Sequence, residues 1–245
     1  MRGRGGAPFI FISRLKPITK KAGPLWFGSG VTGSGKDNTM LKCAVFASGG
    51  GTNFQSLIDR KKTGDLHVEF VLFVGNNSKA QSFDRARENN IPTLHLSPSH
   101  FDSGQEYTKR LLEELRSHET ECIILAGYMK IIPVEVVRAY SNRIVNIHPA
   151  LLPSFGGEGM YGKRVHQAVL DYGAKVTGVT VHFVDEEYDR GPIIFQRTVE
   201  VLDDDDADTL AARVLTAEHN SYWRAVEAIA QGRIIVKGRK AFGKA

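Results

Sequence analysis

The sequence predicts an α/β domain with a Rossmann-like, mostly parallel sheet, helices on both faces and antiparallel strands near the C-terminal end. Three observations predict this class. From residue 41 onward, short apolar runs alternate with longer amphipathic stretches, as strands alternate with covering helices. The first runs are apolar almost throughout, which is typical of strands buried on both faces of a parallel sheet. After residue 173 apolar and polar residues alternate within the runs, which favours antiparallel strands.

The first part of this domain reads as alternating strands and helices. The helix expected at residues 103–118 is clearly amphipathic, with Tyr107, Leu111, Leu112 and Leu115 on one face. The other helices are expected at residues 53–62 and 79–89. Buried strands are expected at residues 43–48, 68–74, 92–96, 122–126 and 144–147.

The last part predicts an antiparallel extension of the sheet. Residues 176–184 and 193–201 read as two strands joined by a tight acidic loop, and a long helix follows at residues 208–231. Residues 234–236 read as an edge strand. The organised domain is therefore expected to span residues 41–236, with residues 237–245 as a basic tail.

Charge is unevenly distributed along the 245 residues. Residues 1–40 contain seven Lys/Arg and one Asp, whereas the remaining 25 Lys/Arg and 26 Asp/Glu sum to −1. The nearly neutral body disfavours nucleic acid as a partner, and no apolar run is long enough to span a membrane. Cys43 and Cys122 lie in apolar runs, where buried thiols are expected rather than a disulfide or a metal site. No motif calls for a metal.

Residues 1–40 are basic, poor in acidic residues and interrupted by glycine and proline. Three interpretations stay open: a disordered or cleaved leader, a transit peptide, or an upstream extension with Met40 as the working start. The cytoplasm is the default location, and a plastid or another organelle is the alternative if this segment is a transit peptide. Residues 30–36 match the glycines and lysine of a P-loop, but Asp37 replaces the Ser or Thr that would hold magnesium, so no working P-loop is expected.

Polar side chains follow two of the predicted strands. Asn146 and His148 lie where the strand at residues 144–147 runs into a turn, and Asp189 lies in the loop after the strand at residues 176–184. An amide donor, an imidazole and a carboxylate can together stabilise an oxyanion and move a proton. No serine or cysteine is obviously paired with His148. The pattern therefore favours acyl transfer, with attack by the substrate's own nucleophile, over covalent hydrolysis.

The loop Ser-Gly-Gly-Gly-Thr-Asn at residues 48–53 joins a buried strand to a helix. Ligands of such folds bind at the carboxyl ends of strands, and exposed amides at a helix start attract phosphate. Thr52 or Asn53 is expected to cap the helix or to add a hydrogen bond. The loop lacks the full dinucleotide fingerprint, so a monophosphate fits it better than a nicotinamide cofactor, and a tight turn without a ligand is the alternative.

Four segments in this order resemble a known family. They are the glycine loop, Ala-Gly-Tyr-Met-Lys-Ile-Ile at residues 126–132, Asn-Ile-His-Pro-Ala-Leu-Leu-Pro at residues 146–153, and the Asp189 loop. Together they resemble the phosphoribosylglycinamide formyltransferases (glycinamide ribonucleotide transformylases), which are folate-dependent formyltransferases, over residues 41–236. The resemblance implies that 10-formyltetrahydrofolate is the co-substrate. It also implies transfer of the formyl group to the glycine amine of 5-phosphoribosylglycinamide, in de novo purine (IMP) synthesis.

The resemblance also implies roles for particular residues. Asn146 and His148 would donate to the formyl oxygen, and Asp189 would relay the proton that the amine loses. The implied ribonucleotide-binding residues are Gly51, Thr52, Asn53 and Glu218. The implied folate-binding residues are Met129, Lys130, Ile131, Ile132, Asn146 and Asp185. Judged without the resemblance, residues 129–132 also fit an ordinary turn, and Glu218 also fits an exposed glutamate on a helix.

Two departures from the family affect the expected substrate affinities. Gly104 stands where some members have an arginine that binds folate, and Arg164 stands where others have a histidine, whereas His166 matches a family histidine. The main rival is 10-formyltetrahydrofolate deformylase, a hydrolase with the same three catalytic residue types, but with a regulatory domain and without this glycine loop. Methionyl-tRNA and sugar-nucleotide formyltransferases and a non-catalytic binding protein are weaker rivals. A homodimer is left open.

Overall fold

Nine strands form one sheet in the computed structural model, which describes residues 40–245. The strands are β1 (Leu41–Ala47), β2 (Val68–Gly75), β3 (Thr93–His95), β4 (Cys122–Leu125), β5 (Ile144–His148), β6 (Val176–Phe183), β7 (Ile193–Glu200), β8 (Ile235–Lys237) and β9 (Lys240–Phe242). The helices are α1 (Thr52–Lys62), α2 (Ser82–Glu88), the 3-10 turn η1 (Pro98–His100), α3 (Gly104–Ser117), α4 (Val134–Ala139), α5 (Lys163–Tyr172) and α6 (Ala207–Ala230).

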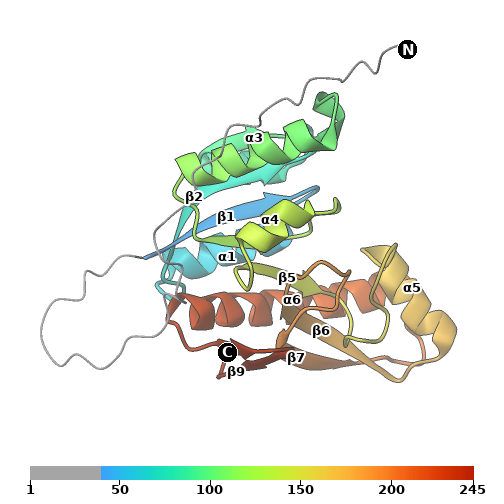
Figure 1. Cartoon of the computed structure of the whole chain (residues 1–245). Coiled ribbons are helices and arrows are strands. Elements are labelled where there is room, and N and C mark those ends of the chain that lie inside the picture. The colour runs from blue at the N-terminus through green and yellow to red at the C-terminus, as the bar shows by residue number, and fades with distance from the viewer. Residues whose placement is uncertain (1–39) are drawn as a thin grey trace, which may run out of the picture. The chain divides into compact units, whose positions relative to one another are not determined.

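The strand order is β3-β2-β1-β4-β5-β6-β7-β9-β8, and neighbouring strands from β3 to β5 are parallel. β6 is antiparallel to β5 and β7 is antiparallel to β6, as the sequence predicts for the C-terminal strands. The described part of the chain begins with β1 in the middle of the sheet, moves out to β3 and returns to β4 on the other side of β1 (Figure 1). The carboxyl ends of β1 and β4 therefore form the topological switch point at which such sheets bind ligands.

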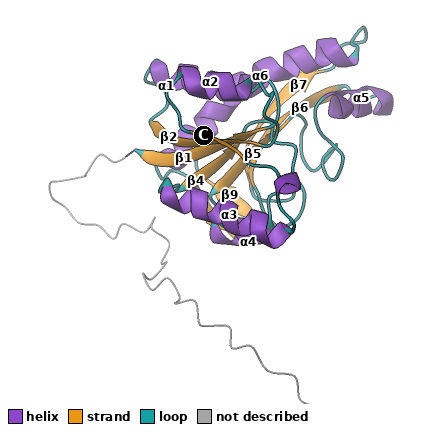
Figure 2. Cartoon of the chain, turned by 90° about the horizontal axis from the view of Figure 1, so that it is seen from above, coloured by secondary structure: helices purple, strands orange, loops and turns teal. Residues whose placement is uncertain are grey.

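Helices cover both faces of the sheet (Figure 2). α1, α2 and α6 lie on one face, and α3 and α4 lie on the other. Along β1, Cys43 and Val45 pack under the first group, whereas Ala44 and Phe46 pack under the second. Burial on both sides explains why this strand is apolar from Cys43 to Ala47. α5 packs with the first half of α6 over β6 and β7 in a third apolar cluster.

Two helices and one strand were not predicted. α4 has six residues and α5 has ten, and both lie in stretches rich in glycine or proline whose apolar pattern is too short to read. Residues 237–245, expected to be a basic tail, contain β9, in which Lys240 pairs with Ile193 of β7. Gly238 adopts a left-handed φ of 57°, which allows the chain to reverse between β8 and β9.

Cys43 and Cys122 are buried free thiols, as expected, and face each other in the register of β1 and β4. Among the helices of residues 40–245, none is long and apolar enough to cross a membrane. The interpretations of residues 1–40, and the P-loop-like stretch at residues 30–36, concern a segment that lies outside the described residues except for Met40.

Candidate functional site

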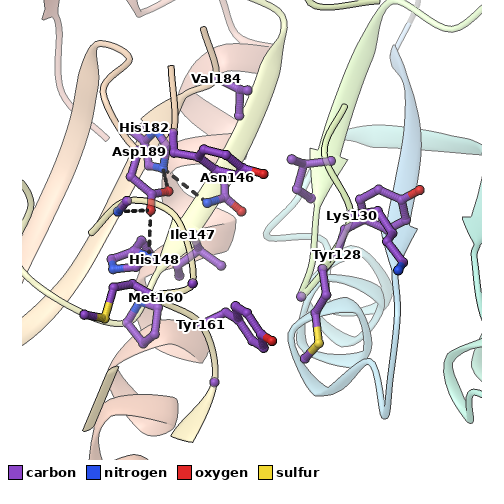
Figure 3. A pocket seen from close by; sticks show the side chains of 18 of the residues that line it. Tyr128, Lys130, Asn146, Ile147, His148, Met160, Tyr161, His182, Val184 and Asp189 are labelled. Atoms are coloured by element: carbon purple, nitrogen blue, oxygen red, sulfur yellow. Dashed lines mark hydrogen bonds and ion pairs between the residues drawn. The ribbon is translucent and has the colours of Figure 1, made fainter. Parts of the chain in front are cut away.

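A cavity of about 520 Å³ opens at the carboxyl ends of β4 and β5 and extends between α5, α6 and the loop after β6 (Figure 3). Segments far apart in the sequence meet here. Most of the residues that the resemblance singles out line this cavity: Asn53, Met129, Lys130, Ile131, Ile132, Asn146, His148, Asp185, Asp189 and Glu218. Gly51 and Thr52 do not line it, and Thr52 lies beside a second cavity of about 410 Å³.

Asn146 faces a histidine that the sequence did not single out. β5 and β6 are antiparallel with Asn146 opposite His182, and the amide Nδ2 lies 3.2 Å from Nε2 of His182. Nδ1 of His182 lies 2.8 Å from the carbonyl oxygen of Phe183, which assigns the ring proton to Nδ1 and leaves Nε2 to accept from Asn146. Burial lowers the pKa of His182, which favours this neutral form. The pairing that would have identified His182 is visible only in the sheet.

His148 is almost fully buried at the end of β5, with 3% of its surface exposed. Its Nε2 lies 2.8 Å from the carbonyl oxygen of Phe155 and donates to it. Its Nδ1 lies 3.7 Å from Oδ2 of Asp189. The backbone therefore fixes one side of the ring, and Nδ1 is the nitrogen that faces the carboxylate.

Asp189 lies between two histidines. Its Oδ2 accepts the N–H of Gly157 at 2.9 Å, and its Oδ1 lies 3.6 Å from Nε2 of His182. Asp189 has a φ of 53°, a left-handed conformation that only a well-packed surrounding holds in place. The backbone at Gly191 packs closely against β6, because a Cβ at this position would lie 1.8 Å from the carbonyl oxygen of Phe183. This close approach explains the Asp-x-Gly spacing.

At the other end of the cavity, Asn53 of α1 and Glu218 of α6 are joined by a hydrogen bond of 2.8 Å. Glu218 is buried, not an exposed helical glutamate, with 7% of its surface in contact with solvent. Burial raises its pKa to about 7, and the hydrogen bond from Asn53 opposes that rise only in part. A buried carboxyl group at the wall of a cavity is a ready acceptor for hydroxyl groups of a ligand.

The glycine loop leads into α1 without the side-chain cap expected from Thr52 or Asn53. Gly51 is the N-cap residue, with a φ of 69°, and no side chain caps the helix. A Cβ on Gly51 would lie 2.7 Å from Cβ of Ser82, so both the backbone and the packing require glycine here. Asn53 lies inside the helix, which starts at Thr52, and its amide Nδ2 donates to Glu218.

The expected folate segment forms the opposite wall of the cavity. Figure 3 shows Tyr128 and Lys130 across the cavity from Asn146 and His148. The side chains of Met129 and Ile131 are exposed, whereas Ile132 is buried in the core. The N–H of Met129 donates to Oγ of Ser48 at 2.8 Å, which ties this segment to the start of the glycine loop.

The loop between β5 and α5 adds two residues that the sequence did not single out, Met160 and Tyr161. The guanidinium of Arg164 lies 5.1 Å from the centre of the Tyr161 ring, so Arg164 supports the wall of the cavity. His166 lines the cavity, and burial together with His148 lowers its pKa. Gly104 starts α3 and does not line this cavity.

Within residues 40–245 the structure shows no group of three or more His, Cys, Asp or Glu side chains that could hold a metal ion.

Comparison with known proteins gives the family. The family model described as formyl transferase matches residues 41–226. The chain is 48% identical over 195 residues to "Phosphoribosylglycinamide formyltransferase, chloroplastic" of Vigna unguiculata, covering 79% of this chain and 62% of that protein. It is 42% identical over 223 residues to the protein of the same name from Arabidopsis thaliana, covering 90% of this chain and 76% of that one. The chain thus spans less than two thirds of the first relative's length.

Solved structures agree. The crystal structure of glycinamide ribonucleotide transformylase 1 from Symbiobacterium toebii matches with a TM-score of 0.80 and 33% identity, covering 86% of this chain and 96% of that one. A formyltetrahydrofolate deformylase from Pseudomonas syringae matches with a TM-score of 0.76 at 24% identity, covering 84% of this chain and 67% of that one, which shows a shared fold only. The chain therefore belongs to the formyl transferase family, in the branch of the phosphoribosylglycinamide formyltransferases.

Proposed function

We propose that the protein transfers the formyl group of 10-formyltetrahydrofolate to the glycine amine of 5-phosphoribosylglycinamide, as in purine synthesis. The observation that carries the proposal is that one cavity is lined both by the residues proposed for the chemical step and by residues proposed to bind the two substrates. Asn146, His148 and Asp189 lie at its centre, and the buried pair Asn53 and Glu218 lies at one side. An exposed apolar segment suited to a flat ring lies across from them. Membership of the formyl transferase family supports the same reaction.

Charge develops on the formyl oxygen when the amine nitrogen bonds to the formyl carbon. Asn146 has a second amide hydrogen beside the one directed at His182, and we assign it to this oxygen. His148 would donate to the oxygen from Nδ1 as the doubly protonated imidazolium, since its Nε2–H is already bonded to the carbonyl oxygen of Phe155. Asp189 would take the proton that the amine loses and pass it, through water, towards the folate nitrogen as its bond to the formyl carbon breaks. One proton leaves the amine and one arrives at the leaving nitrogen.

The glycine loop would hold the phosphate group. No acceptor within residues 40–245 takes the backbone N–H groups of Gly49, Gly50 and Gly51. Together with the start of α1 they offer free backbone donors, as phosphate-binding helix starts do. Thr52, next in the chain, has its side chain exposed beside this loop. Asn53, two residues after Gly51, lines the same cavity as Asn146, so the glycine loop leads directly to the wall of that cavity.

The proposal is tested by following folate product formation from a 10-formyl folate with and without 5-phosphoribosylglycinamide. Formation that requires the ribonucleotide would establish the transfer. Losing one oxyanion donor typically lowers the rate by roughly 10²–10³, so we expect Asn146→Ala and His148→Ala to lose about that much kcat. Variants within about tenfold of the parent would refute the assigned roles. Folate turnover without any acceptor would instead identify the deformylase alternative, which shares the three residue types.

We also propose the plastid as the compartment, in place of the cytoplasmic default. Two plant relatives carry the word chloroplastic in their names. Residues 1–40, with seven basic and one acidic residue, have the charge balance of a transit peptide. The homodimer stays a prediction, which sedimentation of the purified chain would decide.

A further inference from the structure

Two carbonyl groups of the glycine loop are bonded to residues of α2. The carbonyl oxygen of Gly50 accepts from Nε of Arg85 at 2.7 Å, and the carbonyl oxygen of Gly49 accepts the N–H of Ser82 at 3.3 Å. In a trans peptide the C=O and the following N–H point in opposite directions. Because both carbonyls are turned towards α2, the N–H groups of Gly50 and Gly51 point away from it. These are the N–H groups proposed to bind phosphate.

Arg85 also makes a hydrogen bond outside the glycine loop. Its Nη1 donates to Oε1 of Gln55 at 2.9 Å, so a single guanidinium joins the loop to the second turn of α1. Its Cδ would lie 3.5 Å from a Cβ on Gly51, which shows how closely the side chain follows the loop. The planar fork of an arginine makes these bonds from two separate nitrogens, Nε and Nη1, whereas a lysine has a single nitrogen and does not reproduce this geometry.

We propose that Arg85 is a positioning residue for the phosphate group: it keeps the Gly49 to Gly51 peptides turned so that their N–H groups face the ligand. This inference rests on the proposed function. Arg85 lies on the carbonyl side of the loop and does not touch the phosphate. Its effect should therefore appear in the affinity for a phosphorylated acceptor and not in the chemical step.

The same helix offers a matched control. Arg87 is two residues further along α2, but its Nη1 pairs with Asp84 at 3.1 Å and its guanidinium lies 5.4 Å from the centre of the Phe83 ring. It therefore carries the same charge on the same helix without a bond to the glycine loop.

The test uses the full chain and two acceptors, 5-phosphoribosylglycinamide and the corresponding glycinamide riboside without the phosphate. Loss of a charge-assisted hydrogen bond is typically worth about tenfold or more in affinity, so we expect Arg85→Ala to raise the KM of the phosphorylated acceptor by roughly that factor. The kcat and the folate KM should stay within about twofold, because Arg85 bonds to Gly50 and Gln55, and none of these three residues lines the cavity that holds Asn146, His148 and Asp189. With the riboside, parent and variant should have the same kcat/KM. Arg85→Lys should recover only part of the loss, and Arg87→Ala should match the parent.

Three results would overturn the inference. An equal loss with the riboside would make Arg85 a purely structural residue. Full recovery in Arg85→Lys, or an equal loss in Arg87→Ala, would attribute the effect to charge alone. If Arg85→Ala does not fold, as judged by circular dichroism, Arg85→Lys decides the question. A parent chain that formylates neither acceptor would refute the proposed function instead, and binding of inorganic phosphate, measured by calorimetry, would then decide the inference by the same comparison of variants.

Discussion

Asn146 has two amide hydrogens, and one of them is directed at Nε2 of His182, 3.2 Å away. This bond fixes the plane of the carboxamide, because His182 is itself held by the carbonyl oxygen of Phe183. The donor proposed for the formyl oxygen is therefore oriented before any ligand binds. Such preorganisation is what makes an oxyanion donor effective.

His182→Leu removes the acceptor and leaves the Asn146 amide free to rotate, so we expect kcat to fall by roughly tenfold, less than the roughly 10²–10³ expected for Asn146→Ala. Steady-state kinetics of both variants with saturating substrates would measure this. A His182→Leu enzyme with the kcat of the parent would show that His182 does not orient the amide.

The stability of the protein should depend on pH through Glu218. The pKa of Glu218 is raised from an ordinary value of 4.5 to about 7, so the folded state binds this proton more tightly than the unfolded state. The resulting stabilisation is fully present below pH 4.5 and is lost as the pH rises through about 7. A shift of that size corresponds to roughly 3 kcal/mol. Glu218→Gln should remove this contribution to the pH dependence.

Urea unfolding of parent and Glu218→Gln between about pH 5 and pH 8.5 measures the effect. The difference in free energy of unfolding between the two proteins should change with pH in the direction stated. Glu186→Gln is a suitable control, because Glu186 is exposed and Arg138 lowers its pKa, so no loss of stability towards high pH is expected from it. A constant difference between parent and Glu218→Gln would contradict the prediction.

At the scale of elements, the connection between β6 and β7 determines where Asp189 lies. The strands are joined by a short loop that returns so closely to Phe183 that only glycine fits at position 191. The N–H of Phe183 also donates to the carbonyl oxygen of Pro192, which closes the loop. The local backbone, not a distant contact, therefore brings the carboxylate towards His148.

Gly191→Ala should consequently displace the Asp189 loop. Forcing a methyl group into a filled space typically destabilises a protein by about 1–3 kcal/mol, and we expect a loss of activity in addition. Gly104→Ala is the matched control, because no atom lies within 4 Å of a Cβ there and alanine favours the helix. Thermal unfolding and kcat of the two variants give the measurement. Equal behaviour of the two variants would refute this account of the loop.

At the scale of the whole molecule, charge and function are separated along the chain. All residues assigned to the catalytic and binding sites lie within residues 41–245, whose formal charges sum to −1. Residues 1–40 carry a formal charge of +6, which gives the net charge of +5. The two segments are therefore expected to have different tasks, chemistry for one and targeting for the other.

Removal of residues 1–39 should leave kcat/KM for both substrates within about twofold of the full chain, because every site residue is retained. In plant cells, residues 1–40 fused to a fluorescent protein should direct it to plastids, as the basic composition of a transit peptide implies. Steady-state assays and fluorescence microscopy measure the two effects. Cytoplasmic fluorescence would restore the default location, and a large loss of activity would assign residues 1–39 a part in the site.

Much of the fold was predictable because its signals are local. The strands at residues 68–74 and 176–184 are observed as Val68–Gly75 and Val176–Phe183, since apolar runs of this length are read directly. α4, with six residues, was missed because one turn and a half carries too little periodicity. The strand Lys240–Phe242 was missed because it has only three residues, begins with a lysine and lies between Arg239 and Gly243. Its order comes from pairing with β7 and β8.

The sequence by itself determined the fold class, the family and the placing of Asn146, His148 and Asp189 at strand ends, because hydrophobic periodicity and a motif such as Asn-x-His act over a few residues. Only the tertiary structure decided that His182 faces Asn146. It also decided that Glu218 is buried against Asn53, which is 165 residues away along the chain. Strand pairing and burial are set by segments that meet only on folding, and no local pattern encodes which polar groups are left facing one another.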